Sequence, residues 1–152
     1  MKTYYSLIPA WLVAVAGIPC LFAMTFQQAD PVLKKYQWKS RVLLVFAPVE
    51  ESPDFLKQRN IDQQAREGYG ERDLVVLELF QREGREVGGT ALTRPQVDAL
   101  RKQFGVKTDG FTVILLGKDG GEKLRQTRPL LSEELFRLID SMPMRQGEMR
   151  RQ

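Results

Sequence analysis

The chain contains no histidine, and Cys20 is the only cysteine among its 152 residues. Without histidine there is no imidazole to act as a general acid or base, to activate a serine or cysteine, or to bind a metal ion. With one cysteine, no disulfide can form within the chain. We therefore predict no histidine-based catalytic site, no metal site and no cofactor.

The composition is that of one ordinary globular domain. Apolar residues make up 43% of the chain and charged residues 28%, and a chain of this length can bury a core without disulfides or metals. The net charge is +4, with both signs interspersed, and no motif combines basic with aromatic residues. We therefore predict no nucleic-acid partner.

The N-terminal segment has the pattern of an export signal. Lys2 is followed by a charge-free stretch over residues 7–26, in which Ala23 offers a small residue at a cleavage position. This predicts a signal peptide over residues 1–23 and a periplasmic or secreted mature protein. Two alternatives stay open. The stretch is long enough to be an uncleaved anchor in the inner membrane, and Cys20 could carry the lipid of a lipoprotein.

Three apolar runs predict the strands of a sheet. Residues 41–47, 73–80 and 111–116 are rich in apolar, often β-branched side chains, which is typical of strands buried on both faces. The sequence Lys118-Asp119-Gly120-Gly121 is a turn signal and predicts an antiparallel return strand over residues 122–126.

Capping signals predict a helix after each of these units. Ser52-Pro53 is a helix start, Thr93 opens a capping box, and Ser132 can cap a last helix. The first helix is expected to end at about Glu67, before two glycines, and the last at Pro143.

The resulting order is βαβαββα, which matches a thioredoxin-like three-layer sandwich of the α/β class, although other α/β sandwiches stay open. We assign residues 30–145 to this domain and residues 146–152 to a polar, frayed tail. The glycine-bearing segment 81–92 is expected to be a loop. The strand residues predicted to be buried are Val42, Leu44, Val45, Leu74, Val76, Val113 and Leu115.

The second half of the chain resembles a thioredoxin. The match joins Leu100-Arg101-Lys102-Gln103-Phe104-Gly105-Val106 to Phe111-Thr112-Val113-Ile114-Leu115-Leu116-Gly117-Lys118-Asp119-Gly120. In thioredoxins a helix ends in Phe-Gly-Val, and a cis-proline at the start of the next strand shapes the substrate groove. Phe111 stands at that position here, so the resemblance implies the fold but weakens an oxidoreductase function.

The junction after the first strand is similar to the reactive loop of peroxiredoxins, but it lacks the reactive residue. That loop reads Pro-x-x-x-Thr/Ser-x-x-Cys, and this chain has Pro48, Ser52 and then Phe55 in the cysteine position. Aligned with the Cys-x-x-Cys of thioredoxins, the cysteine positions fall on Glu50 and Pro53. Since thiolate chemistry requires sulfur, we expect no thiol redox activity.

Five segments carry a further resemblance, which spans roughly residues 33–149. They are Tyr36-x-Trp38-Lys39-x-Arg41, Leu43-Leu44-Val45-Phe46-Ala47-Pro48, Arg72-Asp73-Leu74-Val75-Val76, Leu116-Gly117-Lys118-Asp119-Gly120-Gly121-x-Lys123-Leu124-Arg125 and Ile139-Asp140-Ser141-Met142-Pro143-Met144-Arg145. Through them the chain resembles a bacterial peroxiredoxin-like domain family of unknown function, which also occurs in vertebrate secreted sushi-repeat proteins. The resemblance implies an exported thioredoxin-like domain and no established reaction.

We interpret the chain as a binding or interaction module for an unknown protein or small molecule of the envelope. Ligands of α/β sheets bind at the carboxyl ends of strands, so the predicted binding face is the former active-site loop: Pro48, Glu50, Glu51, Ser52 and Phe111. Two alternatives stay open, an envelope enzyme that uses carboxylates or an unrecognised cofactor, and a membrane-tethered envelope protein. Convergent acids with shifted pKa values would favour the enzyme, and an exposed apolar patch would favour the binding module.

Overall fold

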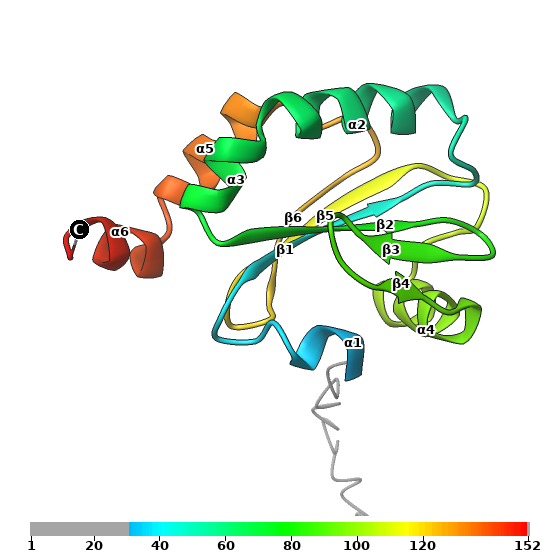
Figure 1. Cartoon of the computed structure of the whole chain (residues 1–152), viewed down its shortest axis with the longest axis horizontal. Helices are drawn as coiled ribbons and strands as arrows, with labels where there is room; N and C mark the ends of the chain where they lie inside the picture. The colour runs from blue at the N-terminus through cyan, green and yellow to red at the C-terminus, as the bar shows by residue number, and fades with distance from the viewer. Residues whose placement is uncertain (1–30, 152) are drawn as a thin grey trace, which may run out of the picture.

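Six strands form one mixed sheet in the computed structural model, which describes residues 31–151 (Figure 1). The strands are β1 (Arg41–Phe46), β2 (Leu74–Leu79), β3 (Gly84–Glu86), β4 (Ala91–Leu92), β5 (Thr112–Leu116) and β6 (Glu122–Gln126). Their order in the sheet is β4-β3-β2-β1-β5-β6. Strands β1 and β2 are parallel, and the other neighbouring pairs are antiparallel.

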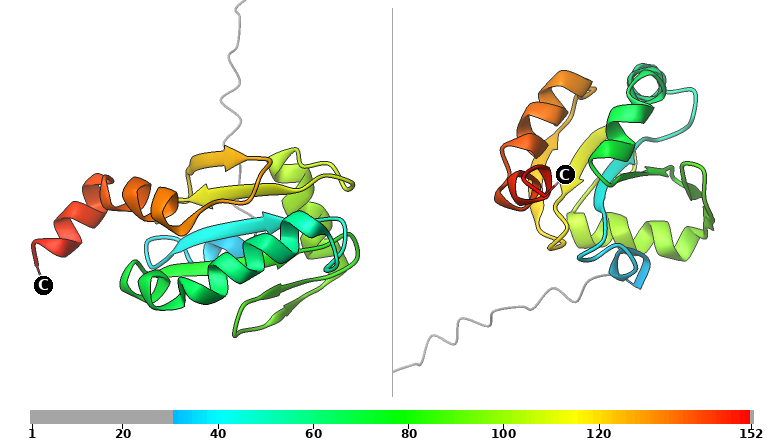
Figure 2. Two further views of the ribbon diagram at one scale, coloured as in Figure 1. Left: turned by 90° about the horizontal axis from the view of Figure 1, so that it is seen from above. Right: turned by 60° about the vertical axis from the view of Figure 1, so that its left-hand side comes forward.

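Helices cover both faces of this sheet, which makes three layers (Figures 1 and 2). Helices α2, α3 and α5 lie on one face, and α1 and α4 lie on the other. The helix bounds are α1 (Pro31–Lys34), α2 (Pro53–Gln64), α3 (Arg66–Glu71), α4 (Arg94–Phe104), α5 (Ser132–Asp140) and α6 (Pro143–Met149). Each face of the sheet has its own apolar core, so the central strands are buried on both sides.

The predicted core is confirmed. All six residues of β1 are buried, and so are the seven strand residues predicted from the apolar runs. Helix α4 also begins and ends as its sequence predicts. The Gln96 side chain accepts a hydrogen bond from the Thr93 backbone N–H at 2.8 Å, and Gly105 closes the helix at a φ of 61°, where a residue without Cβ is favoured.

The loop predicted over residues 81–92 is instead a hairpin, because it contains β3 and β4. Gly84 is the residue that permits it. A Cβ at Gly84 would lie 2.9 Å from the backbone oxygen of Glu78 and 2.9 Å from the Val97 side chain. Only glycine lets β3 approach β2 and helix α4 this closely. The sequence shows the glycine but not its neighbours, which is why the strand was missed.

The helix predicted to end at about Glu67 ends earlier, at Gln64, and a second helix, α3, follows it through Gly68 and Gly70. Glycine usually weakens a helix interior, but Gly68 is required by packing. A Cβ at this position would lie 2.5 Å from the Phe136 ring of α5. The missing side chain lets α5 pack against α3, and this contact outweighs the local preference.

The frayed tail predicted from residue 146 is replaced, up to Met149, by helix α6. Its Glu148 carboxylate forms hydrogen-bonded ion pairs with Arg41 at 3.2 Å and with Lys118 at 2.8 Å. Arg41 is only 1% exposed, and a buried charge requires such a partner. We call this arrangement of Arg41, Lys118 and Glu148 the α6 clasp.

Both apolar cores and all six strands of the sheet lie within residues 31–151. The predicted signal peptide over residues 1–23 lies outside the described residues. Within the described part, no helix has both the length and the apolar character to cross a membrane.

Candidate functional site

The loop predicted as the binding face follows β1, at the carboxyl end of the strand. Pro48, Glu50 and Ser52 are half-buried there, and Glu51 is exposed. Phe111 lies at the same end of the sheet, because it precedes β5, whose Thr112 pairs with Phe46. The Phe111 ring is buried in the core beneath the loop. The structure therefore brings these residues together but leaves only the loop accessible to a ligand.

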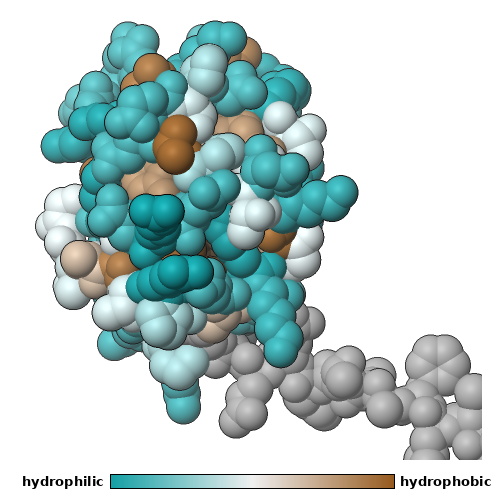
Figure 3. All heavy atoms as spheres, turned by 90° about the vertical axis from the view of Figure 1, so that its right-hand side faces the viewer, coloured by the Kyte–Doolittle hydropathy of each residue, from teal (hydrophilic) through white to brown (hydrophobic). Residues whose placement is uncertain are grey.

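The end of the molecule that carries this loop has a mainly hydrophilic surface. Figure 3 looks at the right-hand side of Figure 1, and it shows separate apolar side chains among polar ones rather than one continuous apolar area. Within the described residues there is no cis peptide bond, so the cis-proline geometry of thioredoxins is absent from this part of the chain. This end of the molecule therefore has no broad apolar face for docking a partner in the part that the structure describes.

Glu50 connects the loop to a network of charged side chains on the neighbouring strands. Its carboxylate accepts two hydrogen bonds from Arg85 of β3, at 2.6 and 3.1 Å, and lies 3.9 Å from Arg59 of α2. Hydrogen bonds from Arg85 hold the pKa of Glu50 below its usual range. Arg85 also donates its Nε–H to Glu78 of β2 at 2.5 Å. Glu50 is therefore engaged as an ionised anchor and is not free to work with Glu51 as an acid–base pair.

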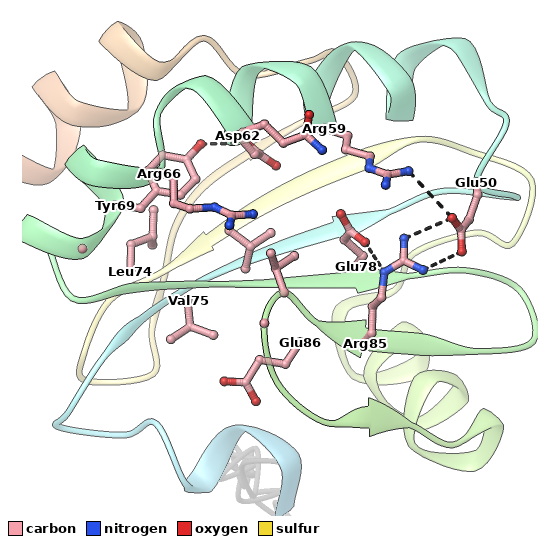
Figure 4. A pocket seen from close by; sticks show the side chains of 15 residues that line it. Glu50, Arg59, Asp62, Arg66, Tyr69, Leu74, Val75, Glu78, Arg85 and Glu86 are labelled. Atoms are coloured by element: carbon pink, nitrogen blue, oxygen red, sulfur yellow. Dashed lines mark hydrogen bonds and ion pairs between the residues drawn. The ribbon is translucent and has the colours of Figure 1, made fainter.

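This network forms one end of a groove of about 490 Å³ between helices α2–α3 and strands β2–β3 (Figure 4). Leu74, Val76 and Glu78 come from β2, and Arg85 and Val87 come from β3 and the residue after it. The opposite wall is made by side chains of α2 and α3, namely Arg59, Asp62, Gln63, Arg66 and Tyr69. The groove thus combines apolar side chains, mainly from β2, with charged side chains from both walls, and polar groups in such a site can fix the orientation of a ligand.

Asp62 is the most perturbed acid of the groove. Its Oδ1 atom accepts hydrogen bonds from Gln58 at 2.7 Å and from the Tyr69 hydroxyl at 2.6 Å. Burial raises the pKa of Asp62 to about 6, with a smaller contribution from the charge of Glu78, although the two hydrogen bonds oppose this rise. Both of these donors reach Oδ1, so Oδ2 is left without a protein partner among the described residues.

Tyr69 serves Asp62 as a donor and not as a base. Burial and the neighbouring carboxylate raise the pKa of the Tyr69 hydroxyl far above its usual range. The phenol therefore stays protonated at any physiological pH, and its O–H donates a hydrogen bond to Oδ1 of Asp62. Its ring is held by an edge-on contact with Phe136, with centroids 5.8 Å apart.

The pKa of Asp62 leads to a stability prediction. The pKa of Asp62 is about 6 in the folded state, compared with an ordinary value of 3.8, so ionisation of Asp62 opposes folding. The resulting loss of stability is absent below pH 3.8, grows as the pH rises from 3.8 to 6, and is complete above pH 6. The full cost is about 3 kcal/mol. Asp62→Asn keeps the Oδ1 acceptor without the charge. We expect it to raise the free energy of unfolding by about 1–3 kcal/mol near pH 7 and by almost nothing near pH 4.

Urea denaturation of the wild type and the variant at both pH values measures this effect. The difference between the two proteins isolates Asp62, because every other carboxylate titrates in both. The exposed Asp109 supplies the matched control Asp109→Asn, for which we expect a change within about 0.5 kcal/mol. A difference for Asp62→Asn that is equal at both pH values would contradict the proposed titration.

The groove was not predicted from the sequence. One signal was present, because Glu78 interrupts an otherwise apolar strand, and a charge in such a strand needs a partner. The partner, Arg85, lies in the segment that was predicted to be a loop. Asp62 is held in the groove by a hydrogen bond from Tyr69 of the next helix, and the spacing of the two residues in the sequence does not reveal this contact.

Comparison with known proteins identifies related sequences. Residues 32–148 match the model of a family described as a domain of unknown function, DUF4174. Sushi repeat-containing protein SRPX2 of Xenopus laevis is 25% identical over 126 residues, covering 81% of this chain and 28% of that protein. Coiled-coil domain-containing protein 80 of Danio rerio is 24% identical over 149 residues, covering 88% and 17%. The chain therefore spans less than a third of these relatives.

Solved structures share the fold at low sequence identity. The reduced 2-Cys peroxiredoxin of Plasmodium vivax superimposes with a TM-score of 0.58 at 15% identity, covering 77% of this chain and 84% of that one. Thioredoxin peroxidase I of Plasmodium yoelii gives a TM-score of 0.57 at 14% identity, covering 76% and 79%. This likeness confirms the thioredoxin-like α/β fold and carries nothing about activity.

Proposed function

We propose that this chain, which belongs to the DUF4174 family of domains of unknown function, is an exported binding module that takes its ligand in the groove between α2–α3 and β2–β3. The supporting observation is the groove itself. Its volume of about 490 Å³ lies in the range of small-molecule sites, roughly 300–1,000 Å³, and its lining combines apolar with charged side chains.

The absence of cysteine from the reactive positions supports binding rather than redox catalysis. The residues at the cysteine positions of related folds are Glu50 and Pro53, or Phe55 in the peroxiredoxin alignment. None of them can form the disulfide or sulfenic acid that thiol cycles require. Of the predicted face, Glu50 lines the groove, and it shares a neighbouring hollow with Pro48 and Glu51.

Export is the second part of the proposal. It rests on the N-terminal sequence, in which a charge-free stretch follows Lys2 and ends near a small residue, Ala23. Removal of residues 1–23 would release the domain into the periplasm or the medium, where it would meet a small molecule or a protein of the envelope. Retention of these residues would tether the same domain to the inner membrane, with the groove unchanged.

A carboxylate-based enzyme is the second candidate, and one observation favours it. Asp62 has a pKa of about 6, to which a second carboxylate, Glu78, contributes, and carboxylates with perturbed pKa values are common in acid–base catalysis. Glu78 is however hydrogen-bonded to Arg85 through Oε2, so only one of its carboxylate oxygens remains to attack a substrate or activate water. Turnover of a groove ligand that Asp62→Asn abolishes would favour the enzyme.

A fragment screen by NMR tests the binding function. The chain starting at Met24, labelled with ¹⁵N, is titrated with a library of small molecules. We expect bound compounds to shift the amide signals of groove residues such as Tyr69 and Gly88. Val87→Trp places an indole in the groove and should abolish these shifts, because Val87 stands at its wall and is 38% exposed.

The control for this variant is Leu131→Trp. Leu131 is 53% exposed and does not line the groove, so an added indole there should leave the shifts intact. A library without any groove ligand, or ligands that bind Val87→Trp as well as the wild type, would contradict the proposal.

A further inference from the structure

We infer that the groove binds an organic cation, an alkylammonium or guanidinium group on an apolar stem, with the cationic head between Asp62 and Glu78. A lysine or arginine side chain has this chemistry. The inference rests on the proposed function, since it names the class of ligand that the same groove takes.

The first argument is the hydrogen-bonding capacity that the two carboxylates leave unused. Asp62 directs Oδ1 to Gln58 and Tyr69, and Glu78 directs Oε2 to Arg85. Among the described residues, Oδ2 of Asp62 and Oε1 of Glu78 have no protein donor. Both residues line the groove, and their side chains point into it in Figure 4. An ammonium group has three N–H donors and no acceptor, so it can satisfy both oxygens.

The second argument is the choice between an organic cation and a metal ion. No group of three or more possible ligands from histidine, cysteine, aspartate or glutamate exists in the part of the chain that the structure describes. Two carboxylate oxygens alone are a poor cage for a divalent ion, which takes six or more oxygens in the case of calcium. An ammonium or guanidinium group needs only acceptors at hydrogen-bond distance.

The third argument concerns the stem of the ligand. Beside the two carboxylates, the groove is lined by the apolar side chains of Leu74, Val76 and Val87. Alkyl chains bury their methylenes on such surfaces while the charged head reaches polar atoms. Each methylene that leaves water strengthens binding several-fold. The groove therefore favours an alkyl cation over a small inorganic one.

An anionic ligand is the competing possibility, because Arg66 on the groove wall has no ion-pair partner among the described residues. Arg66 is exposed, and an anion held there would remain in solvent, where a single ion pair contributes little. It would also leave the unused oxygens of Asp62 and Glu78 without a donor. Arg66 is better suited to a carboxylate of a zwitterionic ligand whose cation already occupies the deeper site.

The affinity of the groove for a cation is expected to depend on pH. The charged and titratable groups that line the groove with Asp62 are Glu50, Arg59, Arg66, Tyr69, Glu78, Arg85 and Glu86. The pKa of Asp62, about 6, lies between pH 5 and 7.5. A cation binds the ionised form, of which only about one tenth is present at pH 5, so affinity should fall about tenfold from pH 7.5 to pH 5.

Three probes of one length test the inference: n-pentylammonium, 1-pentanol and pentanoate. Each is titrated into the ¹⁵N-labelled chain starting at Met24, at pH 7.5 and pH 5. We expect n-pentylammonium to shift the groove amides with a saturable curve, and 1-pentanol to bind at least about tenfold more weakly. Asp62→Asn, which we expect to be at least as stable as the wild type, should reduce n-pentylammonium binding at least about tenfold and remove its pH dependence. Asp109→Asn should bind like the wild type.

Equal binding of n-pentylammonium and 1-pentanol, or unchanged binding by Asp62→Asn, would overturn the inference. Saturable binding of pentanoate but not of n-pentylammonium would overturn it in favour of an anion at Arg66. If the fragment screen yields groove ligands but n-pentylammonium does not bind, the inference is wrong and the proposed function stands. If neither the screen nor the amine yields binding, both are wrong.

Discussion

Replacing Glu148 by alanine is expected to lower the free energy of unfolding by about 3–5 kcal/mol, because it leaves a buried charge unpaired. Arg41 is 1% exposed, and its guanidinium donates to both Glu148 carboxylate oxygens at 3.2 and 3.3 Å. Lys118 loses an ion pair at 2.8 Å in the same variant. Urea denaturation at neutral pH measures the loss.

The α6 clasp also has an expected pH dependence. Burial disfavours the charge of Glu148, but Lys118 and Arg41 outweigh it and hold the pKa of Glu148 below the ordinary value of 4.5. The clasp therefore stabilises the fold fully above that value and is lost as the pH falls through the folded-state pKa. Glu83, an exposed loop residue, supplies the control Glu83→Ala, with a change within about 0.5 kcal/mol. A loss below about 1 kcal/mol for Glu148→Ala would show that α6 is not held by this clasp.

Gln58→Leu is expected to cost about 3 kcal/mol of stability, because it removes the partner of two buried backbone groups. Gln58 is fully buried. Its Oε1 accepts the Leu130 N–H at 2.6 Å, and its Nε2 donates to the Leu130 carbonyl at 3.3 Å. Leucine has a similar volume, so the cost comes from unsatisfied hydrogen bonds rather than from a cavity.

The same urea assay measures this loss, with Gln63→Leu as the matched control. Gln63 lies on the same helix and is exposed, so its replacement should change stability by no more than about 0.5 kcal/mol. Similar losses for both variants would contradict the role of Gln58. Because Gln58 also donates to Asp62, the variant should raise the pKa of Asp62 further.

The fold was predictable because its main signals are local. Apolar runs mark β1, β2 and β5, and the Lys118-Asp119-Gly120-Gly121 turn marks the hairpin to β6. What local patterns could not show were elements held by distant partners. Helix α6 depends on Arg41, which is 107 residues from Glu148 in the sequence, and β3 depends on the room that Gly84 leaves beside Val97.

The candidate site was predictable only at its rim. Glu50 lies in the loop to which the peroxiredoxin resemblance points, but its partner Arg85 is 35 residues away. In the sequence, Asp62 looks like an ordinary charged residue on a helix surface. Only the structure shows that its carboxylate is buried and hydrogen-bonded to Gln58 and Tyr69. Resemblance to peroxiredoxins directs attention to the position of their reactive cysteine, whereas the groove lies beside it. Asp62, Tyr69 and Arg85 line the groove and lie outside the segments that carry the resemblance, although Leu74 and Val76 lie within one of them.

Four of the five segments that carry the family resemblance contact one another at the opposite end of the sheet, whereas the fifth, residues 43–48, runs along β1 to the candidate site. The Trp38 N–H donates to the Lys118 carbonyl at 2.6 Å, and the Arg41 N–H donates to the Asp73 carbonyl at 2.8 Å. Trp38 and Asp73 both adopt positive φ angles, 64° and 47°, which cost energy for residues other than glycine. Together with Glu148, these residues form a structural junction, so the resemblance reports on the architecture of the domain more than on its ligand.

The pKa of Asp62 with and without a bound amine tests the central claim most directly. The carboxyl carbon of Asp62 can be followed by ¹³C NMR across a pH titration, with Asp62→Asn to assign the signal. We predict a pKa of about 6 in the free protein and a clear fall in saturating n-pentylammonium, because a cation bound at Oδ2 favours the ionised form. A pKa that the amine leaves unchanged would contradict a ligand site built on this carboxylate.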